Sequence, residues 1–132
     1  MIRNLDLRQQ QGGGHVCPCT DINISSPGDS DSTIKIRTLF DSGANASFMS
    51  KACVDKMGLA ATGGKHTVDM GNAVRVHALG TAEATLHFGD TKVKWQFGVL
   101  DQMLEPMILG MDFFHAKGVV LDSDEKTIKT QL

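Results

Sequence analysis

Short stretches in which apolar and polar residues alternate recur along the chain, a pattern typical of half-buried β-strands. Residues 20–24 and 33–40 alternate in this way. Between them, residues 26–32 form a dense run of turn-forming residues, Ser-Pro-Gly-Asp-Ser-Asp-Ser. The pattern predicts two strands joined by a long loop.

Two more hairpins follow. Residues 66–76 read as two short strands around a Gly-Asn turn at Gly71. Residues 81–88 and 91–100 again alternate, and the Gly-Asp pair that begins at Gly89 separates them. Short strands therefore dominate, and the sequence predicts a mainly β fold.

One or two short helices are predicted among these strands. Apolar residues spaced by three or four run through residues 46–58, and Gly58 stands where it would end a helix. Residues 106–110 form an apolar strand that ends in glycine. Asp112 follows it and is expected to cap a second helix that ends at Lys117. Residues 119–121 and 127–130 are then expected to close the sheet.

The 132 residues suffice for one domain with a core of its own. A hydrophobic content of 41% and a charged content of 21% are ordinary for a globular protein, which excludes a disordered or fibrous class. Residues 1–14 are polar and end in Gln-Gln-Gln-Gly-Gly-Gly, a composition that predicts a flexible leader before a domain of residues 15–132.

Charge and hydropathy limit the partners. The net charge is −2 and the basic residues are scattered, which argues against nucleic acid as a partner. No apolar run is long enough to span a bilayer and the N-terminus is not signal-like, so no membrane partner is expected. A cytoplasmic setting is the expectation that follows.

The cysteines and histidines do not suggest a metal site. Cys17 and Cys19 are too close in sequence for ordinary disulfide geometry, so free thiols are expected. His15 with these two cysteines is only a partial zinc motif, because no second pair at ligand spacing follows. Cys53 is expected to be a small core residue. We therefore predict no metal and no cofactor.

The segment with the strongest chemical signal is Asp-Ser-Gly-Ala at residues 41–44. Acid, serine and glycine are common in plain turns, which is the competing interpretation. Here, however, an apolar strand precedes the acid and apolar residues follow it, so Asp41 is expected at the edge of the core. The other Asp-Ser pairs lack the following glycine and lie in polar runs. Ser42 lacks the Gly-x-Ser-x-Gly setting of a serine hydrolase nucleophile.

Residues 38–50 resemble the active-site segment of retropepsin-like aspartic proteases, and residues 108–114, Ile-Leu-Gly-Met-Asp-Phe-Phe, resemble the second signature of that family. Within this family, residues 49–53 are similar to the DNA-damage-inducible ubiquitin-shuttle proteases. Residues 71–74 through 109–113 are more similar to long-terminal-repeat retrotransposon proteases. The resemblance implies a closed, β-barrel-like acid protease fold with one or two short helices. Because the chain has one catalytic motif, it also implies a homodimer.

The resemblance also implies residue roles. Asp41 would be the catalytic carboxylate, supported by Ser42, Gly43 and Ala44. A flap over the substrate would involve Met70, Gly71, Asn72 and Val74, and the core under the active site would be Ile108, Leu109 and Gly110. Without the neighbouring signatures, the Gly-Asn pair would be read simply as a hairpin turn.

The function expected is that of an aspartic endopeptidase. It would cleave extended peptide or polyprotein segments through two Asp41 carboxylates of a homodimer that activate water. One alternative is a catalytically silent dimerisation or peptide-binding domain with the same fold. Another is a monomeric β-barrel without enzymatic activity.

Overall fold

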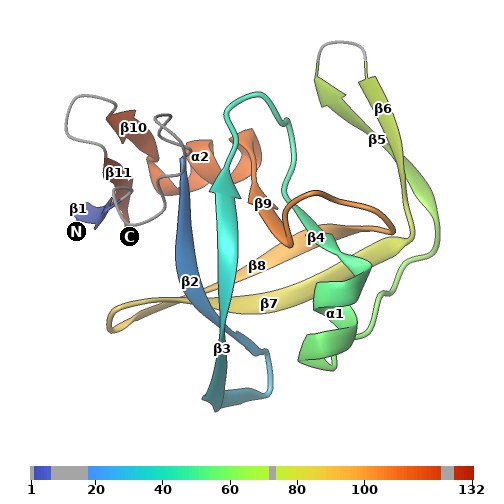
Figure 1. The fold of residues 1–132 in the computed structure, drawn as a ribbon, viewed down its shortest axis with the longest axis horizontal. Helices are drawn as coiled ribbons and strands as arrows, with labels where there is room; N and C mark the ends of the chain where they lie inside the picture. Colours follow the sequence, from blue (N-terminus) through green and yellow to red (C-terminus); the bar gives the residue numbers. More distant parts are fainter. Residues whose placement is uncertain (1, 7–17, 72–73, 123–126) are drawn as a thin grey trace.

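The computed structural model describes residues 2–6, 18–71, 74–122 and 127–132. Strands account for most of these residues (Figure 1). The elements in chain order are β1 (Ile2–Asp6), β2 (Cys19–Ser26), β3 (Asp29–Phe40), β4 (Phe48–Ser50), α1 (Lys51–Met57), β5 (His66–Gly71), β6 (Val74–Ala78), β7 (Gly80–Phe88), β8 (Thr91–Leu100), β9 (Met107–Leu109), α2 (Met111–Lys117), β10 (Val120–Asp122) and β11 (Thr127–Gln131). The predicted mainly β class with short helices is confirmed.

Six strands form a closed barrel in the order β2-β3-β9-β4-β8-β7. The short strand β9 lies between β3, to which it is parallel, and β4, to which it is antiparallel. It enters the barrel from a part of the chain almost 70 residues after β3. This insertion brings the two sequence signatures together.

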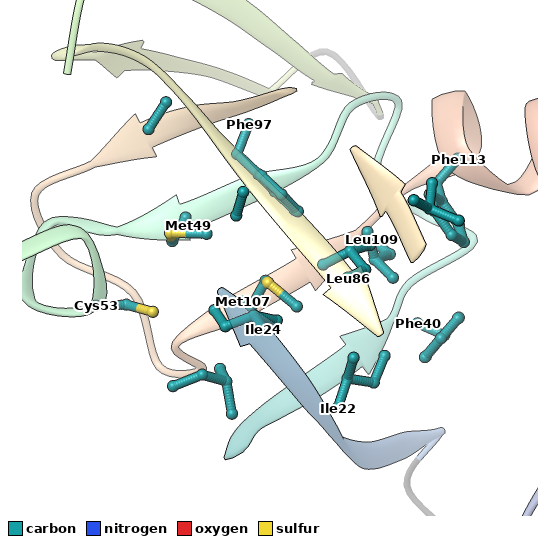
Figure 2. Close-up of a cluster of buried hydrophobic side chains, with 14 of the residues drawn as sticks. Ile22, Ile24, Phe40, Met49, Cys53, Leu86, Phe97, Met107, Leu109 and Phe113 are labelled. Atoms are coloured by element: carbon teal, nitrogen blue, oxygen red, sulfur yellow. The ribbon is translucent and has the colours of Figure 1, made fainter. Parts of the chain in front are cut away.

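The alternating patterns place apolar side chains inside the barrel. On β2, Ile22 and Ile24 are buried whereas Asp21 and Asn23 are exposed. Figure 2 shows the resulting core, which draws side chains from all six barrel strands and from both helices. The labelled members are Ile22, Ile24, Phe40, Met49, Cys53, Leu86, Phe97, Met107, Leu109 and Phe113.

The predicted long loop at residues 26–32 is wrong. β2 continues to Ser26 and β3 begins at Asp29, so only Pro27 and Gly28 of this segment lie outside the strands, and Ser26 pairs with Asp29 after a register shift between Ile24 and Ser26. Strand pairing needs only backbone groups, and nothing at this exposed hairpin tip has to be buried. The polar composition therefore did not prevent strand formation.

The predicted helix at residues 46–58 begins later than expected. Phe48–Ser50 is strand β4, buried along its length, and α1 follows directly. A short apolar run that is buried on both faces does not reveal its period. Ser50 caps α1 by accepting a hydrogen bond from the Cys53 amide, and Gly58 ends the helix with a φ of 68°.

The chain ends form a separate sheet in the order β1-β11-β10. The predicted C-terminal strands are present, but they do not close the barrel sheet, because β11 pairs with β1 on one side and with β10 on the other. The predicted flexible leader is wrong for Ile2–Asp6, which pairs with β11 along its whole length. Residues 7–14, and His15 and Cys17 of the partial zinc motif, lie outside the described residues.

Hairpin β5–β6 forms a two-stranded sheet of its own and projects away from the barrel (Figure 1). The predicted hairpin β7–β8 is confirmed, and Gly89 adopts a φ of 62° at its turn. The described helices, α1 and α2, have seven residues each, and neither is long enough to cross a membrane.

Candidate active site

Asp41 lies directly after β3, where its main chain and side chain are both held. Its N–H donates to the carbonyl oxygen of Leu109 at 2.9 Å. Its carboxylate Oδ1 accepts the N–H of Gly43 at 2.8 Å. The residue is half-buried, so a fixed carboxylate remains open to solvent on one side. That combination suits a carboxylate that exchanges protons with a bound molecule.

The residues that follow Asp41 form a tight turn around its carboxylate. The Ala44 N–H donates to the Asp41 carbonyl oxygen at 3.2 Å. A Cβ atom at Gly43 would lie 3.2 Å from Asp41 Oδ1, closer than side chains usually approach. Ser42 and Gly43 are exposed, whereas Ala44 is buried. The turn therefore presents one face to solvent and rests on the core with the other.

The turn rests on the end of β9, on Gly110 and on the first residue of α2. Leu109 is fully buried and pairs with Phe40, and Ile108, which is half-buried, lies between Leu39 and Phe48. The N–H of Met111 donates to the Ala44 carbonyl oxygen at 2.7 Å. The segments at residues 41–47 and 109–112 are thus joined by direct backbone bonds.

Ser47 and Asp112, which the sequence did not nominate as site residues, connect the same segments through their side chains. The Ser47 hydroxyl donates to Asp112 Oδ1 at 2.7 Å, and the Ser47 N–H donates to Asp112 Oδ2 at 3.3 Å. The Gly110 N–H in turn donates to Ser47 Oγ at 3.0 Å. Ser47 is only 2% exposed, so these bonds are shielded from water.

The role predicted for Asp112 as a helix cap is wrong. The residue before α2 is Gly110, which has no side chain to cap the helix, and Asp112 is the second residue of α2. Its carboxylate Oδ1 accepts the N–H of Phe113 at 2.7 Å in addition to the Ser47 hydroxyl. The buried Ser47 hydroxyl needs a partner, and the Asp112 carboxylate supplies it, a contact that the local sequence around either residue does not signal.

The structure places Met70 and Gly71 at the end of β5, and Val74 opposite Gly71 at the start of β6. Val74 is 53% exposed, a high value for a valine. Asn72 lies outside the described residues. Arg75 and Asp69 pair across the hairpin at 3.0 Å.

Among the described residues, two other reactive side chains, Ser25 and Cys53, are buried. Ser25 Oγ lies 2.8 Å from His87 Nε2, but Ser25 is fully buried. Burial raises the pKa of the Cys53 thiol, an effect that the nearby Lys56 partly offsets. Cys53 is only 4% exposed and lies in the core. Within the described parts of the chain, no group of three His, Cys, Asp or Glu side chains lies together as a metal site would require.

The chain matches one protein family over residues 31–116, which is more than half of its length. That family is described as "gag-polyprotein putative aspartyl protease". The matched segment contains both the turn at Asp41 and the segment at Gly110. Among curated protein sequences, none matches the chain.

Solved structures with the same fold include two proteases or protease-like domains. The retroviral protease-like domain of Ddi1 from Leishmania major is 12% identical, with a TM-score of 0.58 over 86% of this chain and 92% of that one. The EIAV protease complexed with the inhibitor HBY-793 is 20% identical, with a TM-score of 0.57 over 80% of this chain and 92% of the other. At such identities the likeness establishes the fold, which is that of the retroviral proteases, as predicted.

Proposed function

Because the chain belongs to the gag-polyprotein aspartyl protease family, we propose that it is an aspartic endopeptidase that works as a homodimer. The observation that carries the proposal is the setting of Asp41. Its amide is bonded to Leu109, its carboxylate accepts the Gly43 N–H, and one side is left open. The family and the fold support a peptidase, and this geometry supports Asp41 as its catalytic residue.

The homodimer follows from the chemistry. Water attack on an amide needs one group that donates a proton and another that accepts one. The chain contains a single Asp-Ser-Gly motif, so the second carboxylate comes from Asp41 of a second copy. Two carboxylates that face each other closely share one proton, which supplies an acid and a base in the same place.

The reaction then runs in two steps. The ionised carboxylate takes a proton from water while the water oxygen attacks the scissile carbonyl carbon, and the protonated carboxyl donates its proton to the carbonyl oxygen. The tetrahedral diol breaks down when the carboxyl that took the proton from water gives it to the amide nitrogen, the other carboxylate takes a proton from a diol hydroxyl, and the carbon–nitrogen bond breaks. Water is consumed, and a new carboxyl and a new amine are released.

The substrate proposed is an extended peptide or polyprotein segment. It would lie under hairpin β5–β6, in which Met70 and Gly71 end β5 and Val74 begins β6. A strand-like peptide gains affinity from backbone hydrogen bonds and selectivity from its alternate side chains. Closure of a hairpin over it would exclude water from the reacting groups. The exposure of Val74 supports this role, because a valine that binds substrate would be uncovered in the free protein.

Substitution Asp41→Asn tests the proposal. It keeps the size of the side chain and removes the carboxylate, so we expect peptide cleavage to fall by roughly 1,000-fold or more. Cleavage of an apolar peptide library, read by mass spectrometry, measures the effect. Asp90→Asn is the matched control, because Asp90 is exposed in the turn between β7 and β8. If Asp41→Asn cleaved peptides at the wild-type rate, the proposal would be refuted.

The alternative of a silent binding domain gives a different result in the same experiment. Wild type and Asp41→Asn would then bind an extended peptide equally well, and neither would cleave it. Sedimentation of the wild-type protein measures its mass in solution. A dimer mass is expected for the protease and for the silent binding domain, and a monomer mass for a barrel without activity.

A further inference from the structure

The Asp41 amide and the Asp112 carboxylate are the two ends of one chain of hydrogen bonds. The Asp41 N–H donates to the carbonyl oxygen of Leu109. The same peptide group carries the Gly110 N–H, which donates to Ser47 Oγ. The Ser47 hydroxyl donates to Asp112 Oδ1. Every donor in this chain points from Asp41 toward Asp112.

This uniform direction has a physical consequence. In a row of hydrogen bonds with aligned dipoles, each bond polarises the next and strengthens it. A carboxylate at the accepting end draws the Ser47 proton toward itself, which makes Ser47 Oγ a better acceptor for the Gly110 N–H. The Leu109 carbonyl, in the same peptide group, then becomes a better acceptor for Asp41. Since Ser47 and Gly110 are buried, water does not compete for these bonds.

Asp112 is itself held in one orientation. Its Oδ1 also accepts the Phe113 N–H at 2.7 Å, and its own N–H donates to the Asn45 carbonyl oxygen at 3.2 Å. Phe113 is fully buried and contacts Phe40 and Trp95 edge-on, with ring centroids 6.4 Å and 5.1 Å apart. The carboxylate is thus fixed to the aromatic core beneath the turn.

We propose that Asp112 is a positioning residue, which fixes the location of the Asp41 backbone through Ser47 and the Leu109–Gly110 peptide. The inference rests on the proposed function, since it concerns the placement of the same catalytic carboxylate. The bonds that Ala44 and Asn45 accept from α2 join backbone atoms only. The bonds of Asp112 and Ser47 are the part of the connection that depends on side chains.

Four variants test the proposal by kinetics. Asp112→Ala removes the acceptor, and Ser47→Ala breaks the chain at the next link. We expect either change to lower kcat per active site by about 10- to 100-fold with a much smaller change in KM. Asp112→Asn keeps an oxygen for Ser47 and Phe113 but loses the charge, so its kcat should lie between those of wild type and Asp112→Ala. The double variant Ser47→Ala/Asp112→Ala should be no slower than the slower of the two single alanine variants, because both substitutions interrupt the same chain of hydrogen bonds.

Titration of active sites with a peptide that carries a hydroxyethylene group in place of the scissile amide separates positioning from folding. A merely structural role would reduce the number of titrated sites and leave kcat per site unchanged, which would overturn the proposal. Additive losses in the double variant would overturn it as well. Asp90→Asn again serves as the control.

Amide hydrogen exchange supplies a readout that does not need activity. In Asp112→Ala, we expect the amides of Asp41 and Ser47 to exchange at least ~10-fold faster, with the strands β7 and β8 unchanged. Unchanged protection at Asp41 would refute the positioning role even if the enzyme is active. Faster exchange in a chain whose Asp41→Asn variant retains full activity would refute the proposed function but not the connection between Asp112 and Asp41.

Discussion

Gly110 lies against the main chain of Ala44 so closely that no larger residue fits. A Cβ atom at Gly110 would lie 2.7 Å from the Ala44 carbonyl oxygen and 2.8 Å from the Ala46 carbonyl carbon. Both neighbours are backbone atoms of the turn that carries Asp41. The Ala44 carbonyl oxygen accepts the Met111 N–H and the Asn45 carbonyl oxygen accepts the Asp112 N–H, so this part of the turn is bonded to α2 and cannot move aside independently.

We therefore expect Gly110→Ala to destabilise the fold by at least ~3 kcal/mol, because an added methyl group would have to displace the backbone. Urea unfolding followed by the fluorescence of Trp95, the single tryptophan, measures the change. Gly28→Ala is the matched control. A Cβ there meets nothing within 4 Å and its φ is not in the left-handed region, so its stability should stay close to wild type. Equal stabilities of the two variants would contradict the close contact.

The sequence predicted the strands that alternate cleanly. Residues 81–88 and 91–100 have one buried face and a glycine turn, so period and turn chemistry agree. The prediction of elements from the sequence failed where burial or pairing with a distant strand decided the structure instead of the local pattern of apolar and polar residues. Phe48–Ser50 is buried on both faces and could not be distinguished from a helix, and Ile2–Asp6 pairs with a C-terminal strand that no local pattern reveals.

The arrangement of the candidate site around Asp41 could be predicted only in part. Asp41 stood out because an apolar strand precedes it, and the expectation that Gly110 lies beneath it came from the family resemblance. The bond between Ser47 and Asp112 joins residues 65 positions apart. Neither residue is unusual in its own neighbourhood, so only the insertion of β9 between β3 and β4 brings them together.

Burial of Cys53 predicts a pH dependence of stability. Desolvation is the largest cause that raises the pKa of this thiol above its ordinary value of 9.0, and Lys56 acts weakly in the opposite direction. A raised pKa in the folded state means that the unfolded chain loses its proton first. The contribution to stability is therefore complete below pH 9 and is lost as pH rises through the folded pKa. We expect the urea midpoint to fall above pH 9.

Cys53→Ala isolates this contribution. Its stability at neutral pH should be lower than that of wild type, because a buried sulfur is removed. Its further decrease above pH 9 should be smaller, since the thiol that titrates is gone. A wild-type protein and a Cys53→Ala variant that lose stability in parallel across this range would show that another group is responsible.

A catalytic pair shared between two copies predicts that an inactive subunit also inactivates the wild-type subunit with which it pairs. If each active site needs Asp41 from both copies, a dimer of one wild-type and one Asp41→Asn subunit lacks one carboxylate and cleaves poorly. After subunit exchange at equal concentrations, random pairing leaves roughly one quarter of the dimers wild type. We expect cleavage per total protein to fall to about that fraction, whereas independent active sites in each chain would leave about half. Mixing wild type with Asp90→Asn controls for exchange itself and should leave the rate unchanged. A mixture with Asp41→Asn that keeps half the activity after exchange, verified by mass spectrometry of labelled subunits, would exclude a shared site.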